Sequence, residues 1–127
     1  MKKIIETIPY KDQRYETLGD YYEEDGVMKF KISDVGNKLM EFAIGIHEQI
    51  EEFFTRTEGI SEKHIMEFDL MFEEERKAGL HSDTDEPGAD PRSPYREQHE
   101  FAENIERLII HRGGLNWNDY TKYINSL

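Results

Sequence analysis

The sequence predicts an α+β fold, in which an N-terminal strand and a β-hairpin pack on a core of three main helices and a short C-terminal helix. Two observations predict it. Two strand-like runs are joined by Asp25-Gly26, a dipeptide typical of a tight hairpin. After residue 34, apolar residues recur at helical spacing between stretches rich in Gly and Pro. The 127 residues fit a single domain, 1–127, with a β-rich part at 1–34 and a helical part at 35–127.

The strands come first. Lys3–Ile8 has the composition of a strand, and Pro9 ends it because proline has no N–H to donate to a ladder. Residues 20–24 and 27–32 form the two strands of the hairpin. In the second of these strands the apolar residues occupy every other position, so one face is apolar and predicted to be buried: Met28, Phe30 and Ile32.

Capping residues delimit the first two helices. Ser33 or Asp34 is expected to cap a helix over about residues 36–56. Ser61 is expected to cap a second helix, which ends near Lys77 because Ala78-Gly79 stops it.

A long loop separates the second helix from the third. Residues 79–94 contain three of the four prolines, and a loop of this length tends to be functional or mobile. Ser93-Pro94 is expected to start a third helix that ends at Arg112. Asn116 is expected to cap a short last helix.

The main helices carry apolar stripes that we expect to face the shared core. On the first helix the stripe consists of Leu39, Phe42, Ala43, Ile46, Ile50 and Phe53. On the second it consists of Ile65, Phe68 and Phe72. On the third it consists of Phe101, Ala102, Ile105, Leu108 and Ile109.

Ionisable residues interrupt these stripes. They are His47 and Glu51 on the first helix, Asp69 on the second, and His99 and Glu106 on the third. Burying such groups costs several kcal/mol unless they are paired, hydrogen-bonded or bound to a metal. The pattern therefore predicts a buried polar site where the three helices meet.

The string His47-Glu48-Gln49-Ile50-Glu51 resembles the H-E-x-x-H motif of zincin metallopeptidases, with a glutamate in place of the second histidine. With His99 as third ligand, two imidazoles and one carboxylate suit one divalent ion, Zn²⁺ or Fe²⁺. Asp69 and Glu106 are candidates for further ligands or for groups that orient the first ones. Glu48 is the candidate catalytic base of a metal-dependent hydrolase.

Two other metal sites fit the sequence less well. All-helical nucleotide pyrophosphatases hold magnesium on E-x-x-E pairs, and Glu48/Glu51 and Glu103/Glu106 have this spacing, but their fold has no hairpin. The acidic segment 83–90 has calcium-binding residue types but lacks the EF-hand spacing, so it is predicted to be a flexible connection.

The composition excludes several classes of binding partner and of metal site. The formal net charge of −12 argues against nucleic acid, whose phosphates need clustered Lys and Arg. There is no cysteine, which excludes disulfides and thiolate metal sites and agrees with a cytoplasmic location. No apolar run approaches the roughly 18 residues of a membrane span.

Several strings resemble a family of small uncharacterised bacteriophage and prophage proteins. They are Gly19-Asp-Tyr-Tyr22, Val35-Gly-Asn37, the H-E-x-x-E string, Phe68-Asp69, the segment from Glu86-Pro-Gly to Pro94-Tyr95, and His99 with Ala102, Ile105 and Glu106. The resemblance implies a phage origin and action in the host cytoplasm, with no known activity. It therefore adds an alternative to the hydrolase: a non-enzymatic antagonist of host defence that binds a host protein or a small signal molecule. Oligomerisation is left open.

Overall fold

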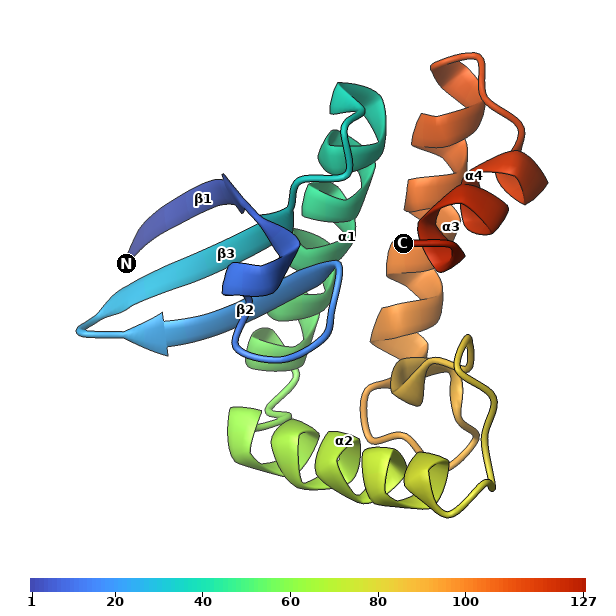
Figure 1. Cartoon of the computed structure of the whole chain (residues 1–127). Helices are drawn as coiled ribbons and strands as arrows, with labels where there is room; N and C mark the ends of the chain where they lie inside the picture. Colours follow the sequence, from blue (N-terminus) through green and yellow to red (C-terminus); the bar gives the residue numbers. More distant parts are fainter.

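A computed structural model describes residues 1–127, and its α+β fold confirms the predicted class (Figure 1). The sheet contains β1 (Lys2–Ile8), β2 (Gly19–Glu24) and β3 (Val27–Ser33). The strand order is β1-β3-β2, so β3 is central, with β1 parallel and β2 antiparallel to it.

The predicted hairpin is confirmed. Asp25 and Gly26 have φ angles of 53° and 75°, and two consecutive residues with positive φ characterise the type I′ turn that two-residue hairpins favour. Met28, Phe30 and Ile32 of β3 are buried, as their alternation predicts. This face packs on the first helix, where Gly45 lies beside Ile32.

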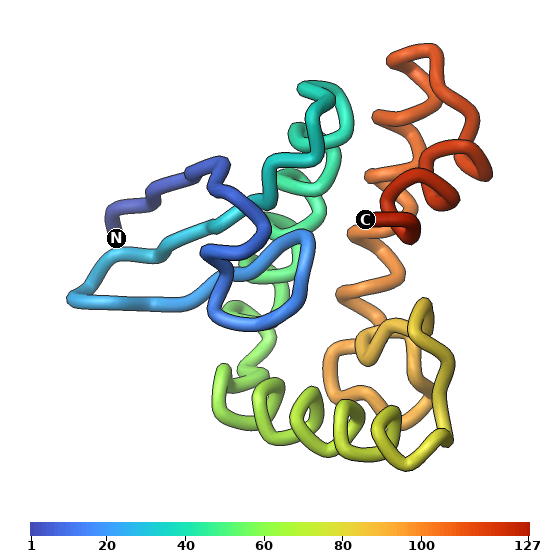
Figure 2. The backbone as a smooth tube through the Cα atoms, viewed as in Figure 1, coloured from blue at the N-terminus to red at the C-terminus, as the bar shows by residue number.

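Four α-helices follow the sheet: α1 (Lys38–Thr57), α2 (Glu62–Lys77), α3 (Arg96–Arg112) and α4 (Trp117–Asn125). None of them combines the length and the apolar character needed to cross a membrane. Figures 1 and 2 show α1 and α3 side by side, with α2 lying across one end of the pair and α4 packed against α3.

The caps of α2 and α4 are confirmed, because the side chains of Ser61 and Asn116 accept hydrogen bonds from the first turns of their helices. The predicted cap of α1 is wrong. Asn37 caps it by accepting a hydrogen bond from Met40 N, whereas Ser33 belongs to β3 and Asp34 bonds to the N–H of Gly36.

The third helix begins two residues later than Pro94, at Arg96. Two short 3₁₀ segments, η1 (Tyr10–Asp12) and η2 (Pro87–Ala89), lie in the connections. The second of these lies within the predicted loop and packs on α2 and α3.

The core is divided between two clusters. The larger lies between the sheet, α1, α3 and α4, and its buried members are Ile32, Val35, Met40, Ala43, Ile44, Ile110 and Tyr120. The smaller joins α2 to the start of α3 through Phe68, Phe72 and Tyr95. The ionisable residues of α1 and α3 lie in the part of the molecule between the two clusters.

Part of the predicted apolar stripes is wrong. Phe42 and Phe53 of α1 are 58% and 45% exposed, and Phe101 and Leu108 of α3 are 47% and 63% exposed. The buried arc of α1 is rotated toward His47 and the other polar residues, because the sheet, α3 and α4 cover that side of the helix.

Candidate metal centre

Two imidazoles converge on one carboxylate oxygen in the interior. His47 Nε2 lies 2.8 Å from Glu51 Oε2, and His99 Nδ1 lies 2.9 Å from the same oxygen. All three residues are buried. Their potential ligand atoms lie within 4.8 Å of one another, so this group can hold a metal ion. It is the only group of three potential ligands that meets this distance.

A carboxylate also lies at the outer nitrogen of each imidazole. His47 Nδ1 is 2.7 Å from Glu106 Oε1, and His99 Nε2 is 2.8 Å from Glu86 Oε2. The five side chains therefore alternate between acid and imidazole, from Glu106 through Glu51 to Glu86. An outer carboxylate on a histidine ligand is the usual second layer of protein metal sites, where it fixes the ring and raises its basicity.

Two of these carboxylates are themselves held in place by hydrogen bonds from tyrosine hydroxyl groups. Tyr120 OH donates to Glu106 Oε2 at 2.5 Å, and Tyr21 OH donates to Glu51 Oε1 at 3.3 Å. Glu106 is thus held by α4, and Glu51 by β2. The sheet and all the packed helices except α2 contribute directly to the alignment of the two imidazoles.

When no metal is bound, the contacts of His47 and His99 require that each imidazole carries a proton on both of its nitrogens. Carboxylates only accept hydrogen bonds, so a ring with both nitrogens against carboxylates donates from both. Burial opposes this charge, but the bonds to Glu51 and Glu86 outweigh it and raise the pKa of His99 to about 10. Burial likewise opposes protonation of His47, yet its bonds to Glu106 and Glu51 raise its pKa well above the ordinary value.

Glu48 lies beside the cluster without joining it. Its carboxylate rests against Gly19, where an added Cβ would come within 2.6 Å of Glu48 Oε1. Burial, followed by the negative charge of Glu51, raises the pKa of Glu48 to about 8. A carboxyl group with this pKa can both accept and donate a proton near neutral pH.

Asp69 lies further from the two imidazoles than Glu51, Glu86 and Glu106 and contacts neither of them. It accepts a hydrogen bond from Tyr95 OH at 2.7 Å and belongs to none of the groups that could hold a metal. Burial raises the pKa of Asp69 to about 7, and the charge of Glu51 adds to the effect.

This raised pKa predicts a pH dependence of stability. Between pH 3.8 and about 7 only the folded state keeps the Asp69 proton, so stability falls as the pH rises, and above pH 7 the loss is complete. Asp69→Asn still accepts from Tyr95 but cannot ionise. Allowing for its partial exposure, we expect this variant to be roughly 2 kcal/mol more stable than the parent at pH 8, and equal to it near pH 4. Urea unfolding at the two pH values measures the difference, and equal gains at both would contradict the assignment.

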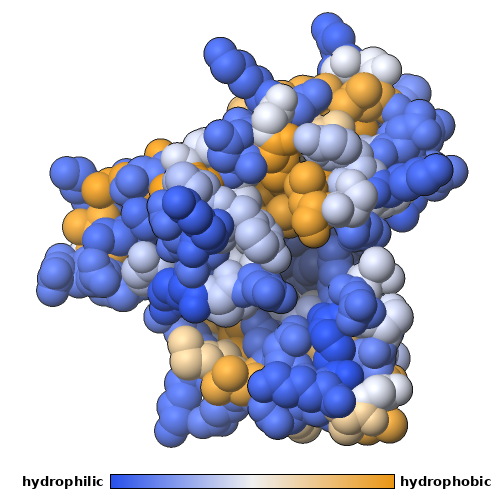
Figure 3. Space-filling model, viewed as in Figure 1, coloured by the Kyte–Doolittle hydropathy of each residue, from blue (hydrophilic) through white to orange (hydrophobic).

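The loop before α3 closes one side of the centre. Glu86 contacts His99, and Gly88 of η2 packs against the face of the same ring. The Glu86 side chain is 56% exposed, so the cluster reaches solvent through this residue. Figure 3 shows a hollow at the middle of one face, where the sheet, α3 with α4, and α2 with the loop meet.

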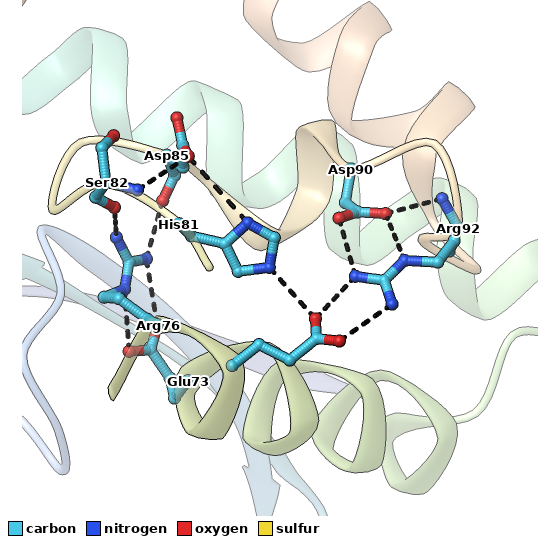
Figure 4. A network of polar contacts seen from close by, with 8 residues as sticks. Glu73, Arg76, His81, Ser82, Asp85, Asp90 and Arg92 are labelled. Atoms are coloured by element: carbon cyan, nitrogen blue, oxygen red, sulfur yellow. Dashed lines mark hydrogen bonds and ion pairs between the residues drawn. The ribbon is translucent and has the colours of Figure 1, made fainter. Parts of the chain in front are cut away.

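A polar network fastens this loop to α2 (Figure 4). Arg92 makes two hydrogen bonds to Glu75, at 2.6 and 3.1 Å. Arg76 donates to the carbonyl oxygens of Ser82 and Asp85. The network therefore holds both ends of the segment that carries Glu86 against the helix.

The structure brings together His47, Glu51 and His99 of the predicted site. It places Glu106 behind His47, while Glu48 and Asp69 lie close by without contacting the imidazoles. The alternative magnesium pairs do not assemble, because Glu103 makes none of the contacts of the cluster, and the acidic loop forms no group of ligands.

Sequence reasoning missed the roles of Glu86 and of the tyrosines. Glu86 lies outside any helix, so no periodicity pointed to it, and the only signal was the Pro-Gly that follows. Tyr120 has an apolar ring at a core position of α4, and nothing in the spacing indicates where its hydroxyl goes.

Searches of protein-family models, of curated proteins and of solved structures returned no significant match to this chain.

Proposed function

We propose that this protein binds one divalent transition metal, zinc or iron(II), through His47 Nε2, Glu51 and His99 Nδ1, and uses it in a hydrolytic reaction. One observation carries the proposal: two buried imidazoles point inward at one carboxylate oxygen, and both have a carboxylate on the outer nitrogen.

The distances suit a metal. Bonds of about 2.0–2.1 Å in tetrahedral geometry separate ligand atoms by about 3.4 Å. The two N···O distances of 2.8 and 2.9 Å would lengthen slightly, and the two nitrogens, now within 4.8 Å, would draw together. A metal would replace only the protons on His47 Nε2 and His99 Nδ1, which face Glu51. The hydrogen bonds from the opposite nitrogens to Glu106 and Glu86 would therefore stay intact.

Three protein ligands leave a coordination position open, which is typical of catalytic zinc sites. A bound zinc would supply a Lewis acid and an activated water. Glu48 is one residue after His47 on the same helix, and its raised pKa suits it to accept a proton and return it to a leaving group. Gly19 gives this carboxylate the room it occupies.

Elemental analysis of protein purified without a histidine tag or chelator tests the metal. We expect one equivalent of metal per chain in the parent, and its loss in His47→Ala and in His99→Ala. His64→Ala and His111→Ala are matched controls, because both histidines are exposed and lie outside the cluster. A metal-free parent that takes up no added zinc or iron(II) would overturn the proposal and leave the cluster as a structural network.

Metal binding is also expected to raise the melting temperature. A ligand at 100 times its Kd that binds only the folded state adds about 2.7 kcal/mol of stability. For a chain of 127 residues this corresponds to a rise of about 10 °C. Calorimetry of chelator-treated protein with and without zinc measures the rise. The His99→Ala variant should show none of it, whereas His111→Ala should show it in full.

Hydrolysis is tested separately on the zinc-loaded protein with p-nitrophenyl acetate and a mixed peptide library. We expect Glu48→Gln to keep the metal and to lower the rate by a factor of about 100 or more. Glu52→Gln is the control, since Glu52 is a buried glutamate of the same helix that contacts neither imidazole. Metal binding without any turnover in the parent would restrict the function to metal binding.

A further inference from the structure

One face of the α1–α3 pair is apolar and uncovered. It consists of Phe42, Ile46, Ile50 and Phe53 of α1 with Phe101, Ile105 and Leu108 of α3, and we call it the α1–α3 face. In each helix these residues follow the three- and four-residue spacing of a single stripe. The stripe turns away from the buried side chains of the same helices, such as His47 and Glu106.

The α1–α3 face is continuous across the two helices. The rings of Phe53 and Phe54 are 5.1 Å apart, and those of Phe54 and Phe101 are 5.6 Å apart, both at 89°. The four most exposed side chains are 45–63% accessible, which amounts to roughly 400 Å² of apolar area. An area of about 400 Å² is the size of the largest apolar patch on a typical protein, and such patches are often functional.

The two ends of the α1–α3 face differ in charge. At one end the start of α1 meets the end of α3, where Leu39 packs on Gly113. At the other end the last turn of α1 meets the first turn of α3, where Gln98 donates to Glu58 at 2.6 Å. The helices are therefore antiparallel over their full length (Figure 2).

The charges without an ion-pair partner differ between the ends: they are cations at the first end and anions at the second, where the exposed Arg56 and Arg96 are paired with Glu52 and Glu100. Lys38 and Arg112 at the first end have no ion-pair partner. Glu97 at the second end is also unpaired, and Glu58 there bonds only to a neutral amide. A second copy related by a two-fold axis that lies in the plane of the face, perpendicular to the two helices, would place its anions on these cations. Charge complementarity of this kind is what a two-fold symmetric interface requires.

The accessible area agrees with a missing partner. The chain exposes 7924 Å², whereas a monomeric protein of 15.1 kDa exposes about 7,100 Å². The total area thus exceeds that of an average monomer by about 800 Å², which is large enough to include one partner's share of an interface of standard size.

We propose that the α1–α3 face is the interface of a two-fold symmetric homodimer, in which the apolar stripes of two copies pack together and the basic end of one copy meets the acidic end of the other. The dimer is independent of the metal centre, because the α1–α3 face lies on the opposite side of both helices from His47 and Glu106.

Sedimentation equilibrium of the full chain tests the proposal. It should be done at about 0.15 M salt, which screens the repulsion between two chains of net charge −12. We expect twice the 15.1 kDa mass of one chain at micromolar concentration. Phe42→Glu and Leu108→Glu should each raise the dissociation constant about 30-fold or more, the effect of losing a central contact. Leu70→Glu is the matched control, since Leu70 of α2 is 61% exposed and lies off the face.

A charge exchange separates a homodimer from a site for a different protein. Arg112→Glu and Glu97→Lys should each weaken self-association, and the double variant should restore it, because both changes then face each other across the two-fold axis. The positions substituted in these tests are all exposed, so the circular dichroism spectra of the variants should show unchanged secondary structure. A parent that stays monomeric throughout the micromolar range, or an equal loss in Leu70→Glu, would overturn the proposal.

Discussion

Replacing Glu51 with leucine is expected to lower the free energy of unfolding of the metal-free protein by about 3–5 kcal/mol. Glu51 is the shared partner of two buried imidazoles and also accepts from Tyr21. Removing it leaves His47 and His99, which are both buried, with one unpaired donor each. Breaking a buried charged network from one side costs far more than removing an exposed ion pair.

The size of this effect is large for a small domain. Domains of this length are stable by about 5–15 kcal/mol, so the loss is more than half of the total at the lower end. For 127 residues it corresponds to a fall in melting temperature of about 12–20 °C. Denaturant unfolding in the presence of a chelator measures it, and the same variant should bind no metal.

Glu52→Leu is the control for this experiment. Glu52 is the next residue on α1 and is buried like Glu51, but its only ion pair is with the partly exposed Arg56. One of its carboxylate oxygens has no hydrogen-bond partner, so leucine removes an unsatisfied atom there. We expect a change of at most about 1 kcal/mol. Equal losses in the two variants would mean that the imidazoles draw no support from Glu51.

Gly88→Ala is expected to disrupt the centre from the loop side. A Cβ on Gly88 would lie 2.6 Å from Cγ and Nδ1 of His99, a distance that real Cβ contacts do not show. The ring cannot move aside freely, because Glu51 and Glu86 hold its two nitrogens. The backbone of Gly88 is not in a conformation that favours glycine, so the effect comes from the contacts with the His99 ring and with Tyr95 Cε2, which would lie 2.9 Å from the added atom.

We expect Gly88→Ala to cost about 3 kcal/mol of stability and to weaken metal binding at least about 100-fold, since His99 Nδ1 is the atom displaced. Zinc titration against a competing chelator and denaturant unfolding measure the two quantities. Ala89→Ser, at the exposed neighbouring position, should change neither. If Gly88→Ala destabilises the protein without changing the affinity for zinc, the prediction that the added methyl group displaces His99 Nδ1 is wrong.

The strands and helices follow from local signals. The hairpin turn at Asp25-Gly26, the caps at Ser61 and Asn116 and the alternation in β3 need no knowledge of the rest of the chain. The cap at Asn37 was missed because Ser33, Asp34 and Asn37 are all competent caps, and the choice depends on where β3 ends. That β1 pairs with β3 rather than with β2 is likewise a non-local outcome.

The sequence predicted the residues at the middle of the candidate centre, but it did not predict which residues would surround and orient them. His47 and Glu51 are one helical turn apart, so their proximity follows from the helix alone. His99 is 48 residues away from Glu51, and only the antiparallel packing of α1 on α3 brings its ring to the same oxygen. Which of the remaining acids would bond to the imidazoles depended on that packing as well.

The apolar stripes likewise show that the pattern within one helix does not determine which elements pack against it. A helical wheel identifies Phe42, Phe53, Phe101 and Leu108 as members of a stripe, but it cannot say which neighbours exist to cover them. In this chain the neighbouring elements cover the side of each helix that carries the histidines, so these four apolar side chains remain exposed.

By itself the sequence determined the α+β class, the hairpin, the helices and the presence of ionisable groups at positions where helices pack, because each depends on interactions within a few residues. Only the tertiary structure decided that Glu86 from a loop, Tyr120 from the last helix and Tyr21 from the sheet complete the site, and that one apolar face stays open. These depend on contacts between residues far apart in the chain, whose partners are set by how the two long helices pack and not by the pattern within either one.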